Sequence, residues 1–137
     1  MLAKSTFELV SWEEELLADI PTEQPVAKAS AWYKALQEIT GSFKADYLLH
    51  YSQYNQENPH LSEATYLGYL FFEGVLKGRK GTFVLEERGT FEKGLPHNEL
   101  VIKENTGTEE LSGIQGRGKY FLDGDNLVIE IDYGIEK

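Results

Sequence analysis

The chain has 137 residues, of which 41% are hydrophobic, 12% aromatic and 26% charged, and its formal net charge is −10. We expect one folded domain over residues 1–137 with a sizeable core, and not a disordered chain. The negative charge argues against binding to nucleic acid or to an acidic membrane surface, because both are negatively charged themselves. The absence of cysteine excludes disulfides, thiolate catalysis and cysteine-bound metals.

The N-terminus does not have the pattern of an export signal. Glutamate appears at position 8, and no run of apolar residues is long enough for a transmembrane helix. We therefore expect a cytoplasmic protein, in keeping with the lack of cysteine.

Period-two alternation of apolar and polar residues dominates the chain and predicts eight β-strands. The predicted strands cover approximately residues 5–13, 26–35, 43–54, 64–77, 81–91, 95–103, 118–122 and 125–137. Residues 11–20 have a helix cap and an acidic first turn, but Pro21 limits them to a short helical turn or a loop.

Short turns with glycine, asparagine or proline separate the later strands, as in "KGRK", "EKGLP" and "DGDN". Such turns favour strands that lie beside their neighbours in sequence. No helix of convincing length is available to cover a second face. The prediction is therefore an all-β fold, a closed eight-stranded antiparallel barrel, which hides every strand edge.

The turn "KGRK" determines which side chains point inward. With Gly78 and Arg79 as the central turn residues, Leu70 lies opposite Glu87. The inward face then contains glycines beside bulky residues, namely Gly68, Leu70, Phe72, Gly74, Phe83, Leu85, Glu87, Gly89 and Phe91. We expect these glycines to be structural, because they leave room inside and let the sheet bend. A shift of one residue would exchange the two faces.

Glu87 is then a carboxylate in an otherwise apolar interior. Burial raises the pKa of such a group, which makes it a candidate for function. The structural alternative is that Glu87 lies near the barrel mouth or pairs with a lysine or a tyrosine hydroxyl. The expected ligand contacts are Leu70, Phe72, Phe83, Leu85 and Glu87; no catalytic residue can be assigned.

The outer face of the same hairpin is unusually apolar. Tyr69, Phe71, Val75 and Val84 form one patch there, and a contiguous apolar patch usually marks an interface. We therefore expect a homo-oligomer, a dimer or trimer, formed through the surface around Tyr69, Phe71 and Val84.

Other motifs carry less weight. "GIQGRGKY" resembles part of a phosphate-binding loop, but Tyr120 stands where serine or threonine would bind magnesium, and no strand and helix flank the motif. His50, His60 and His97 lie on separate elements, so no metal site and no cofactor are predicted. "WEEE" at residues 12–15 is interpreted as a solvated acidic turn.

The tyrosines of the third predicted strand, Tyr47, Tyr51 and Tyr54, have two interpretations. Core packing explains Tyr47 and Tyr51 at least as well as a platform for stacking a ligand does.

Several stretches carry a resemblance to a known family. They are "GRKGTFVLEERGTFEKG" from Gly78, "GTEELSGIQGRG" from Gly107, "TFELVSW" at residues 6–12 and "ADYLLHY" at residues 45–51. The chain resembles a bacterial family of domains of unknown function allied to the allene oxide cyclase-like barrels. Members commonly carry glutamate at the position of Leu70 and histidine at the position of Glu87, so this chain departs from the pattern at both.

The resemblance implies a closed barrel whose cyclase cousins hold an oily substrate and shape it for ring closure. Three hypotheses follow: a barrel that binds a small apolar or amphipathic molecule with Glu87 at its polar end, a cyclase or isomerase of such a molecule, and an oligomeric scaffold with a packed interior. A pocket above about 300 Å³ would argue against the scaffold.

Overall fold

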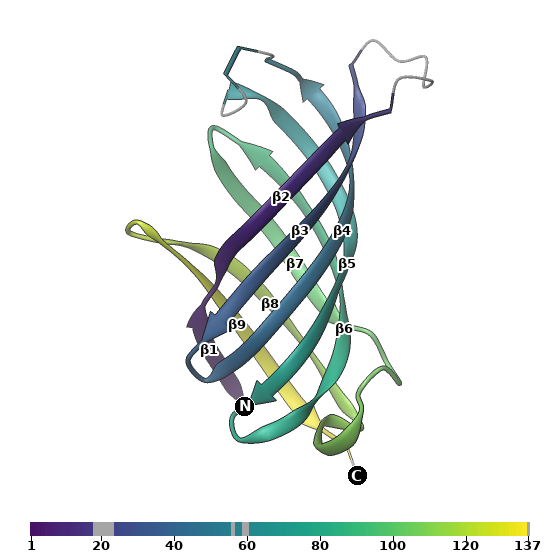
Figure 1. The fold of residues 1–137 in the computed structure, drawn as a ribbon, viewed down its shortest axis with the longest axis vertical. Helices are drawn as coiled ribbons and strands as arrows, with labels where there is room; N and C mark the ends of the chain where they lie inside the picture. Colours follow the sequence, from purple (N-terminus) through teal and green to yellow (C-terminus); the bar gives the residue numbers. More distant parts are fainter. Residues whose placement is uncertain (18–23, 56, 59–60, 137) are drawn as a thin grey trace.

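The computed structural model describes residues 1–17, 24–55, 57–58 and 61–136, and within them the chain forms one antiparallel sheet of nine strands (Figure 1). The strands are β1 (Leu2–Thr6), β2 (Glu8–Leu16), β3 (Val26–Leu36), β4 (Ile39–Gln53), β5 (Glu63–Leu76), β6 (Arg79–Glu92), β7 (Leu95–Ile102), β8 (Ile114–Asp123) and β9 (Asn126–Ile135). A short 3-10 helix, η2 (Glu109–Leu111), lies between β7 and β8. The all-β class expected from the sequence is confirmed.

The sheet curls around its own core but does not close. Its strand order is β1-β9-β8-β7-β6-β5-β4-β3-β2, so β1 and β2 are the two ends, and no ladder joins them in the described residues. The fold is an open half-barrel, and the prediction of a closed eight-stranded barrel was wrong. The reason lies at Phe7, where the chain leaves its neighbour β9 and continues beside β3. Alternation alone cannot reveal such a change of neighbour.

Residues 11–16 form the second half of β2 and not a helical turn. They pair with β3, with Trp12 opposite Ala31, after an irregularity between Leu9 and Ser11. The cross-strand pairing thus prevails over the cap-like local sequence. The rest of the expected turn, residues 18–20 with Pro21, lies outside the described residues.

Side chains cover part of the edge of β1 that no strand pairs with. The N–H of Lys4 donates to Oε1 of Glu38, and the N–H of Thr6 donates to Oε1 of Gln37, both at 3.0 Å. Glu38 and Gln37 belong to the turn between β3 and β4. Backbone donors that would otherwise invite another strand are thereby satisfied.

The hairpin of β5 and β6 turns one residue earlier than expected. Lys77 and Gly78 occupy its centre with φ of 46° and 84°, the geometry of a two-residue hairpin turn. Leu70 therefore pairs with Leu85 and not with Glu87. Because the register differs by two residues and not by one, the faces are as predicted. The five expected ligand contacts on the inward face are all buried, namely Leu70, Phe72, Phe83, Leu85 and Glu87.

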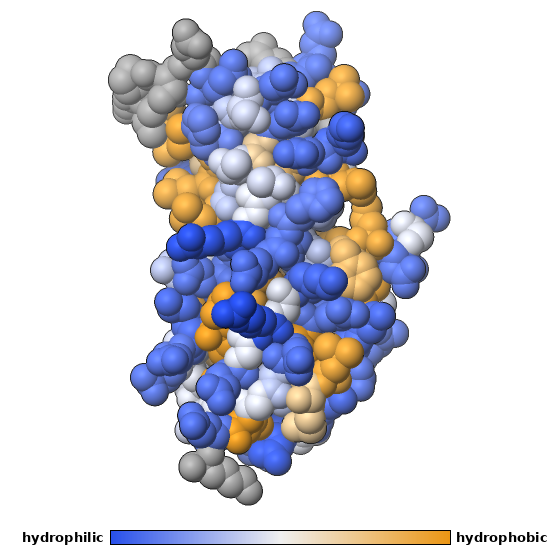
Figure 2. Space-filling view, turned by 180° about the vertical axis from the view of Figure 1, so that it is seen from behind, coloured by the Kyte–Doolittle hydropathy of each residue, from blue (hydrophilic) through white to orange (hydrophobic). Residues whose placement is uncertain are grey.

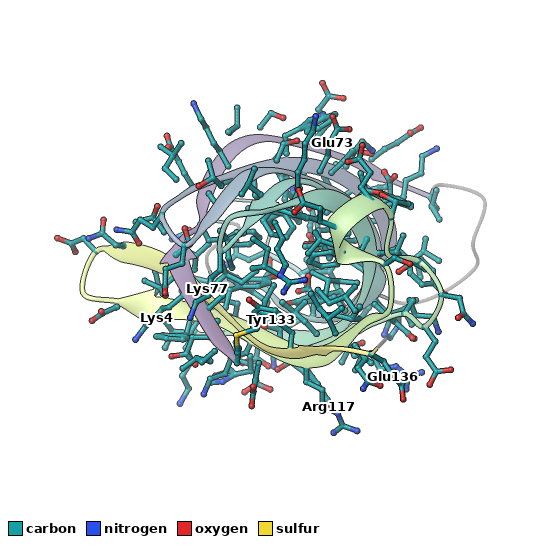
Figure 3. All side chains as sticks on the ribbon, turned by 90° about the horizontal axis from the view of Figure 1, so that it is seen from below. Lys4, Glu73, Lys77, Arg117, Tyr133 and Glu136 are labelled. Carbon is teal, nitrogen blue, oxygen red and sulfur yellow. The ribbon has the colours of Figure 1, made fainter. Side chains whose placement is uncertain are left out.

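Viewed along its length, the sheet wraps around a centre filled with side chains, while Arg117 of β8 points outward (Figure 3). From behind, most of the surface is hydrophilic, and hydrophobic residues gather on the side from which the β8–β9 hairpin projects (Figure 2). Gly118 and Lys119 lie within β8, so "GIQGRGKY" is a strand and not a phosphate loop. Among the described residues, no helix is long and apolar enough to cross a membrane.

Candidate functional site

A cavity of about 430 Å³ is lined by the edge strand β2, the β6–β7 hairpin, the β8–β9 hairpin and the inner side of β3, β4 and β5. Its aromatic lining residues are Trp12, Tyr33, Tyr47, Tyr51, Tyr66, Phe91 and Tyr120. The remaining lining residues are Leu9, Glu14, Leu49, Ala64, Gly94, Pro96, Leu122 and Leu127. A largely apolar cavity of this size, with a few polar groups, is typical of sites for small molecules.

Glu87 lies behind this cavity and is fully buried, with an exposed fraction of 0%. The hydroxyl of Tyr47 donates to its Oε1 at 2.9 Å, and the hydroxyl of Tyr120 donates to its Oε2. Burial raises the pKa of Glu87 to about 7, although hydrogen bonds from Tyr120, Tyr47 and Tyr66 oppose the shift. The carboxyl group is thus close to its midpoint of ionisation at neutral pH.

Two further tyrosines extend the network toward the cavity. The hydroxyl oxygens of Tyr33 and Tyr47 are 3.3 Å apart, and those of Tyr66 and Tyr120 are 3.2 Å apart. Burial, followed by the charge of Glu87, raises the pKa of Tyr66, Tyr47 and Tyr120. Burial likewise raises the pKa of Tyr33 to about 12. All four hydroxyls therefore keep their protons at neutral pH.

The sheet register explains how Tyr47 reaches Glu87. Tyr47 of β4 pairs with Gly68 of β5, which pairs in turn with Glu87 of β6. A Cβ atom at Gly68 would lie 2.7 Å from Cδ1 of Tyr47 and 2.1 Å from the carbonyl oxygen of Asp46. The tyrosine ring therefore lies across the glycine, and only glycine leaves the path open.

Gly89 has the same role for Tyr66. The two residues pair across β5 and β6, and a Cβ atom at Gly89 would lie 2.7 Å from the hydroxyl oxygen of Tyr66. The glycines of this hairpin therefore have a structural role, as expected. At Gly68 and Gly89 that role is to leave room for the rings of Tyr47 and Tyr66.

Asn98 positions Tyr120. The Tyr120 N–H donates to Oδ1 of Asn98 at 2.8 Å, and Nδ2 of Asn98 donates to the Tyr120 carbonyl oxygen at 2.8 Å. Among the described residues, the β7–β8 ladder contains only the pairs Leu100 with Gly118 and Val101 with Arg117. The Asn98 amide thus stands in for missing ladder bonds beside the site.

Phe7, at the break between β1 and β2, packs against both sides of the network. Its ring stacks on Tyr33, with centroids 4.1 Å apart and planes 9° apart, and its centroid is 5.0 Å from that of Tyr120. Phe7 is fully buried. The residue at which the chain changes neighbours thus also packs against two of the tyrosines that line the cavity.

A second carboxylate lies at the rim. The Trp12 Nε1–H donates to Oε1 of Glu14 at 3.1 Å, and the Tyr51 hydroxyl donates to Oε2 of Glu14. Trp12 also stacks over Tyr47, with centroids 5.8 Å apart. Burial, followed by the bond to Glu14, raises the pKa of Tyr51. The interpretation of residues 12–15 as a turn was therefore wrong, because they lie in β2, while their expected exposure is confirmed.

The sequence contains a signal for this rim. Alternation along β2 places Trp12 and Glu14 on one face and Glu13 and Glu15 on the other, and only the first pair lines the cavity. The distant tyrosines Tyr33, Tyr66 and Tyr120 gave no local signal, since they come from three different strands.

The expected ligand contacts lie deeper in the core than the cavity. The ring of Phe72 packs between those of Phe43 and Phe83, with centroids 4.8 Å and 4.9 Å away. Leu70 and Leu85 are fully buried on the same face. None of Leu70, Phe72, Phe83 and Leu85 lines the cavity. Glu87 meets the cavity only through its tyrosines.

The histidines considered as metal ligands lie on separate strands where the structure describes them. His50 on β4 and His97 on β7 are exposed, and His60 lies outside the described residues. Within the residues that the structure describes, no three histidines or carboxylates gather as a metal site would require. Of the tyrosines in residues 47–54, Tyr47 and Tyr51 line the cavity, and Tyr54 packs edge-on against Tyr51 at 4.9 Å.

Comparison with known proteins places the chain in a family. A family model described as "Protein of unknown function (DUF3224)" matches residues 3–133. The chain is also similar to a crystal structure, at 1.84 Å resolution, of a protein with unknown function from the DUF3224 family of Shewanella oneidensis MR-1. The two share a TM-score of 0.82 and 17% identity over 100% of this chain and 98% of the other. No curated protein matches the chain. The family match over residues 3–133 shows that the chain belongs to the DUF3224 family of bacterial proteins of unknown function.

Proposed function

We propose that this protein binds a small apolar or amphipathic molecule in the cavity beneath β2. The observation that carries the proposal is a largely apolar cavity of about 430 Å³ whose lining includes Tyr47 and Tyr120, the two tyrosines whose hydroxyls bond to the buried carboxylate of Glu87. The hydrocarbon part of the molecule lies against the aromatic and leucine side chains of the wall. Its polar end meets the hydroxyls and, through them, Glu87.

The cavity volume favours binding over a packed scaffold. Sites for small molecules begin at about 300 Å³, and this cavity exceeds that volume with a mostly apolar and aromatic lining. Buried carboxylates are also costly, so a fold that needed only a packed interior gains nothing from one at this position.

Native mass spectrometry of freshly purified protein tests the proposal by detecting a retained small molecule. A hydrophobic fluorescent probe gives a second test, with two matched variants. Leu122 lines the cavity mouth and is 44% exposed, whereas Leu2 is 51% exposed and lies on β1, away from the cavity. Leu122→Trp should weaken probe binding and Leu2→Trp should not. Equal effects of both substitutions, or no binding at all, would refute the proposal.

A second candidate function is an isomerase or cyclase acting on the same kind of molecule. The observation that favours it is the pKa of Glu87, which burial raises to about 7, the value at which a proton acceptor and donor works best near neutral pH. An isomerisation moves one proton within the substrate, so the network of Glu87 and its tyrosines can accept that proton and return it with no other reactant. Kinship with the allene oxide cyclase-like barrels, which we infer from the sequence resemblance alone, agrees with this chemistry.

NMR of the recovered molecule separates the two functions, because an isomerisation leaves the mass unchanged. If the protein is an enzyme, the native chain converts the molecule and Glu87→Gln does not. If the protein is a binder, the molecule is unaltered after incubation with either form.

Two expectations remain proposals beside this one. A homo-oligomer formed through the surface around Tyr69, Phe71 and Val84 is consistent with the exposure of Tyr69 and Phe71 on the outer face of β5. A cytoplasmic location rests on the absence of cysteine.

A further inference from the structure

Counting the protons of the tyrosine network fixes the direction of its hydrogen bonds. When Glu87 is ionised, Tyr47 and Tyr120 each use their single hydroxyl proton to donate to it. In the pair of Tyr33 and Tyr47, the donor must then be Tyr33. The proton of Tyr66 likewise points to Tyr120 or to Glu87 itself. All four protons therefore point toward the carboxylate and away from the cavity.

Because the hydroxyl protons point toward Glu87, the tyrosines at the cavity present hydrogen-bond acceptors to a ligand. Tyr33 and Tyr66 end the two chains and line the cavity, and their oxygens have lone pairs left but no proton. The rim behaves in the same way, because the Trp12 N–H and the Tyr51 hydroxyl both donate to Glu14. The polar side chains of the wall can therefore accept hydrogen bonds from a ligand but have none to donate.

The charges of the wall have one sign. None of the described residues that line the cavity is lysine, arginine or histidine. Within the described part of the chain, neither Glu14 nor Glu87 forms an ion pair. Six tyrosine and tryptophan rings surround these carboxylates, and the faces of such rings attract organic cations.

From these observations we infer that the ligand is an amphipathic amine in its protonated form, with a hydrocarbon body and one ammonium group. The inference rests on the proposed function and names its ligand class. The ammonium N–H groups donate to the oxygens of Tyr33 and Tyr66, the aromatic rings surround the charge, and Glu87 balances it through the tyrosines. A carboxylate ligand is disfavoured, since it would need donors and would meet charges of its own sign.

Protonation of Glu87 changes this character. A protonated carboxyl group donates to Tyr47 or Tyr120, that tyrosine then donates outward, and the proton of Tyr33 or Tyr66 turns into the cavity. The titratable groups that face Glu87 are these four tyrosines, one each from β3, β4, β5 and β8. Its partner on β7, Leu100, is apolar and does not titrate. Amine binding should therefore strengthen as the pH rises from 6 to 8, while Glu87 becomes ionised.

A matched series of octylamine, 1-octanol and octanoate tests the inference, by isothermal titration calorimetry at pH 8. We expect octylamine to bind at least about tenfold more tightly than octanol, a factor typical of one charge-assisted hydrogen bond, and octanoate to bind most weakly. If octanol or octanoate binds as tightly as octylamine, the inference is refuted while the proposed binding function stands. If none of the three binds, both fail.

Three variants show whether the carboxylates cause the preference for octylamine over octanol. Glu87→Gln should bring the affinity for octylamine close to that for octanol. Glu14→Gln, at the exposed rim, changes no buried group and should reduce the preference in the same direction. Glu13→Gln removes the same charge from the outer side of β2, where it does not line the cavity, and should leave the preference intact. Equal effects of Glu13→Gln and Glu14→Gln would contradict the inference.

Discussion

Tyr47 and Glu87 lie on strands that do not pair with each other, yet a hydrogen bond of 2.9 Å joins their side chains across Gly68. The tyrosine ring occupies the space that any other residue at position 68 would fill. The site therefore depends on a glycine that contributes no chemical group to it.

Gly68→Ala should destabilise the protein by about 1–3 kcal/mol, the usual cost of forcing an extra carbon atom into a packed interior. The new Cβ would lie 2.1 Å from the Asp46 carbonyl oxygen and 2.7 Å from Cδ1 of Tyr47, so both the backbone and the Tyr47 ring must shift. Urea denaturation measures the loss. Gly134→Ala is the matched control, because no atom of the described residues lies within 4 Å of a Cβ atom there. Similar midpoints for the two variants would show that position 68 tolerates a side chain.

Glu87 should make the stability depend on pH in the opposite sense to an ion-paired carboxylate. Its pKa is about 7 in the folded protein against an ordinary 4.5, so the folded state holds the proton more tightly than the unfolded state. The contribution of Glu87 is thus most favourable below about pH 4.5 and is lost as the pH rises to about 7. The difference corresponds to a contribution on the order of 3 kcal/mol.

The measurement is the free energy of unfolding of the native protein and of Glu87→Gln at intervals from pH 4.5 to 8. The difference between the two proteins isolates Glu87 from the other carboxylates. It should change steadily in favour of the variant as the pH rises. Parallel curves over the whole range would mean that Glu87 does not titrate there.

Asn98→Ala should loosen β8 next to Tyr120. Two hydrogen bonds of 2.8 Å are lost, and the Tyr120 N–H and carbonyl remain without a partner, at a cost of about 1–3 kcal/mol. Hydrogen exchange at the Tyr120 amide should become faster. Glu99→Ala serves as the control, because the Glu99 carboxylate forms an exposed ion pair with Arg117 at 3.6 Å, and such pairs contribute little to stability. Unchanged exchange at Tyr120 in Asn98→Ala would exclude the positioning role.

The outer face of β5 should mediate self-association. Tyr69 and Phe71 are 45% and 48% exposed there, although both are large and apolar. Light scattering at micromolar concentration should give a mass two or three times that of the 15.6 kDa chain. Phe71→Lys should reduce the mass, whereas Leu2→Lys on β1 should not. A mass of one chain for the native protein would end the expectation of an oligomer.

Local pattern was enough to predict an all-β chain and the sides of β5 and β6 that face inward. It did not separate β1 from β2, and it predicted a helical turn or loop where residues 11–16 continue β2. The alternation around Phe83 and Leu85 requires one side of β6 to be buried, and a turn misplaced by one residue did not change that, because the resulting register differs by two. Glu87 could be predicted as a buried carboxylate for the same reason, since its position relative to Phe83 and Leu85 depends only on the period of a strand.

Tertiary structure alone decided what surrounds Glu87 and whether the sheet closes. Tyr33, Tyr47, Tyr66 and Tyr120 come from four strands, and only the curvature of the whole sheet brings their hydroxyls to one point. The break at Phe7 depends on which neighbour each half of the chain can pair with, and that is a property of the assembled sheet. Hydrogen bonds and packing between residues far apart in sequence leave no periodic trace, so no stretch of the sequence by itself reveals them.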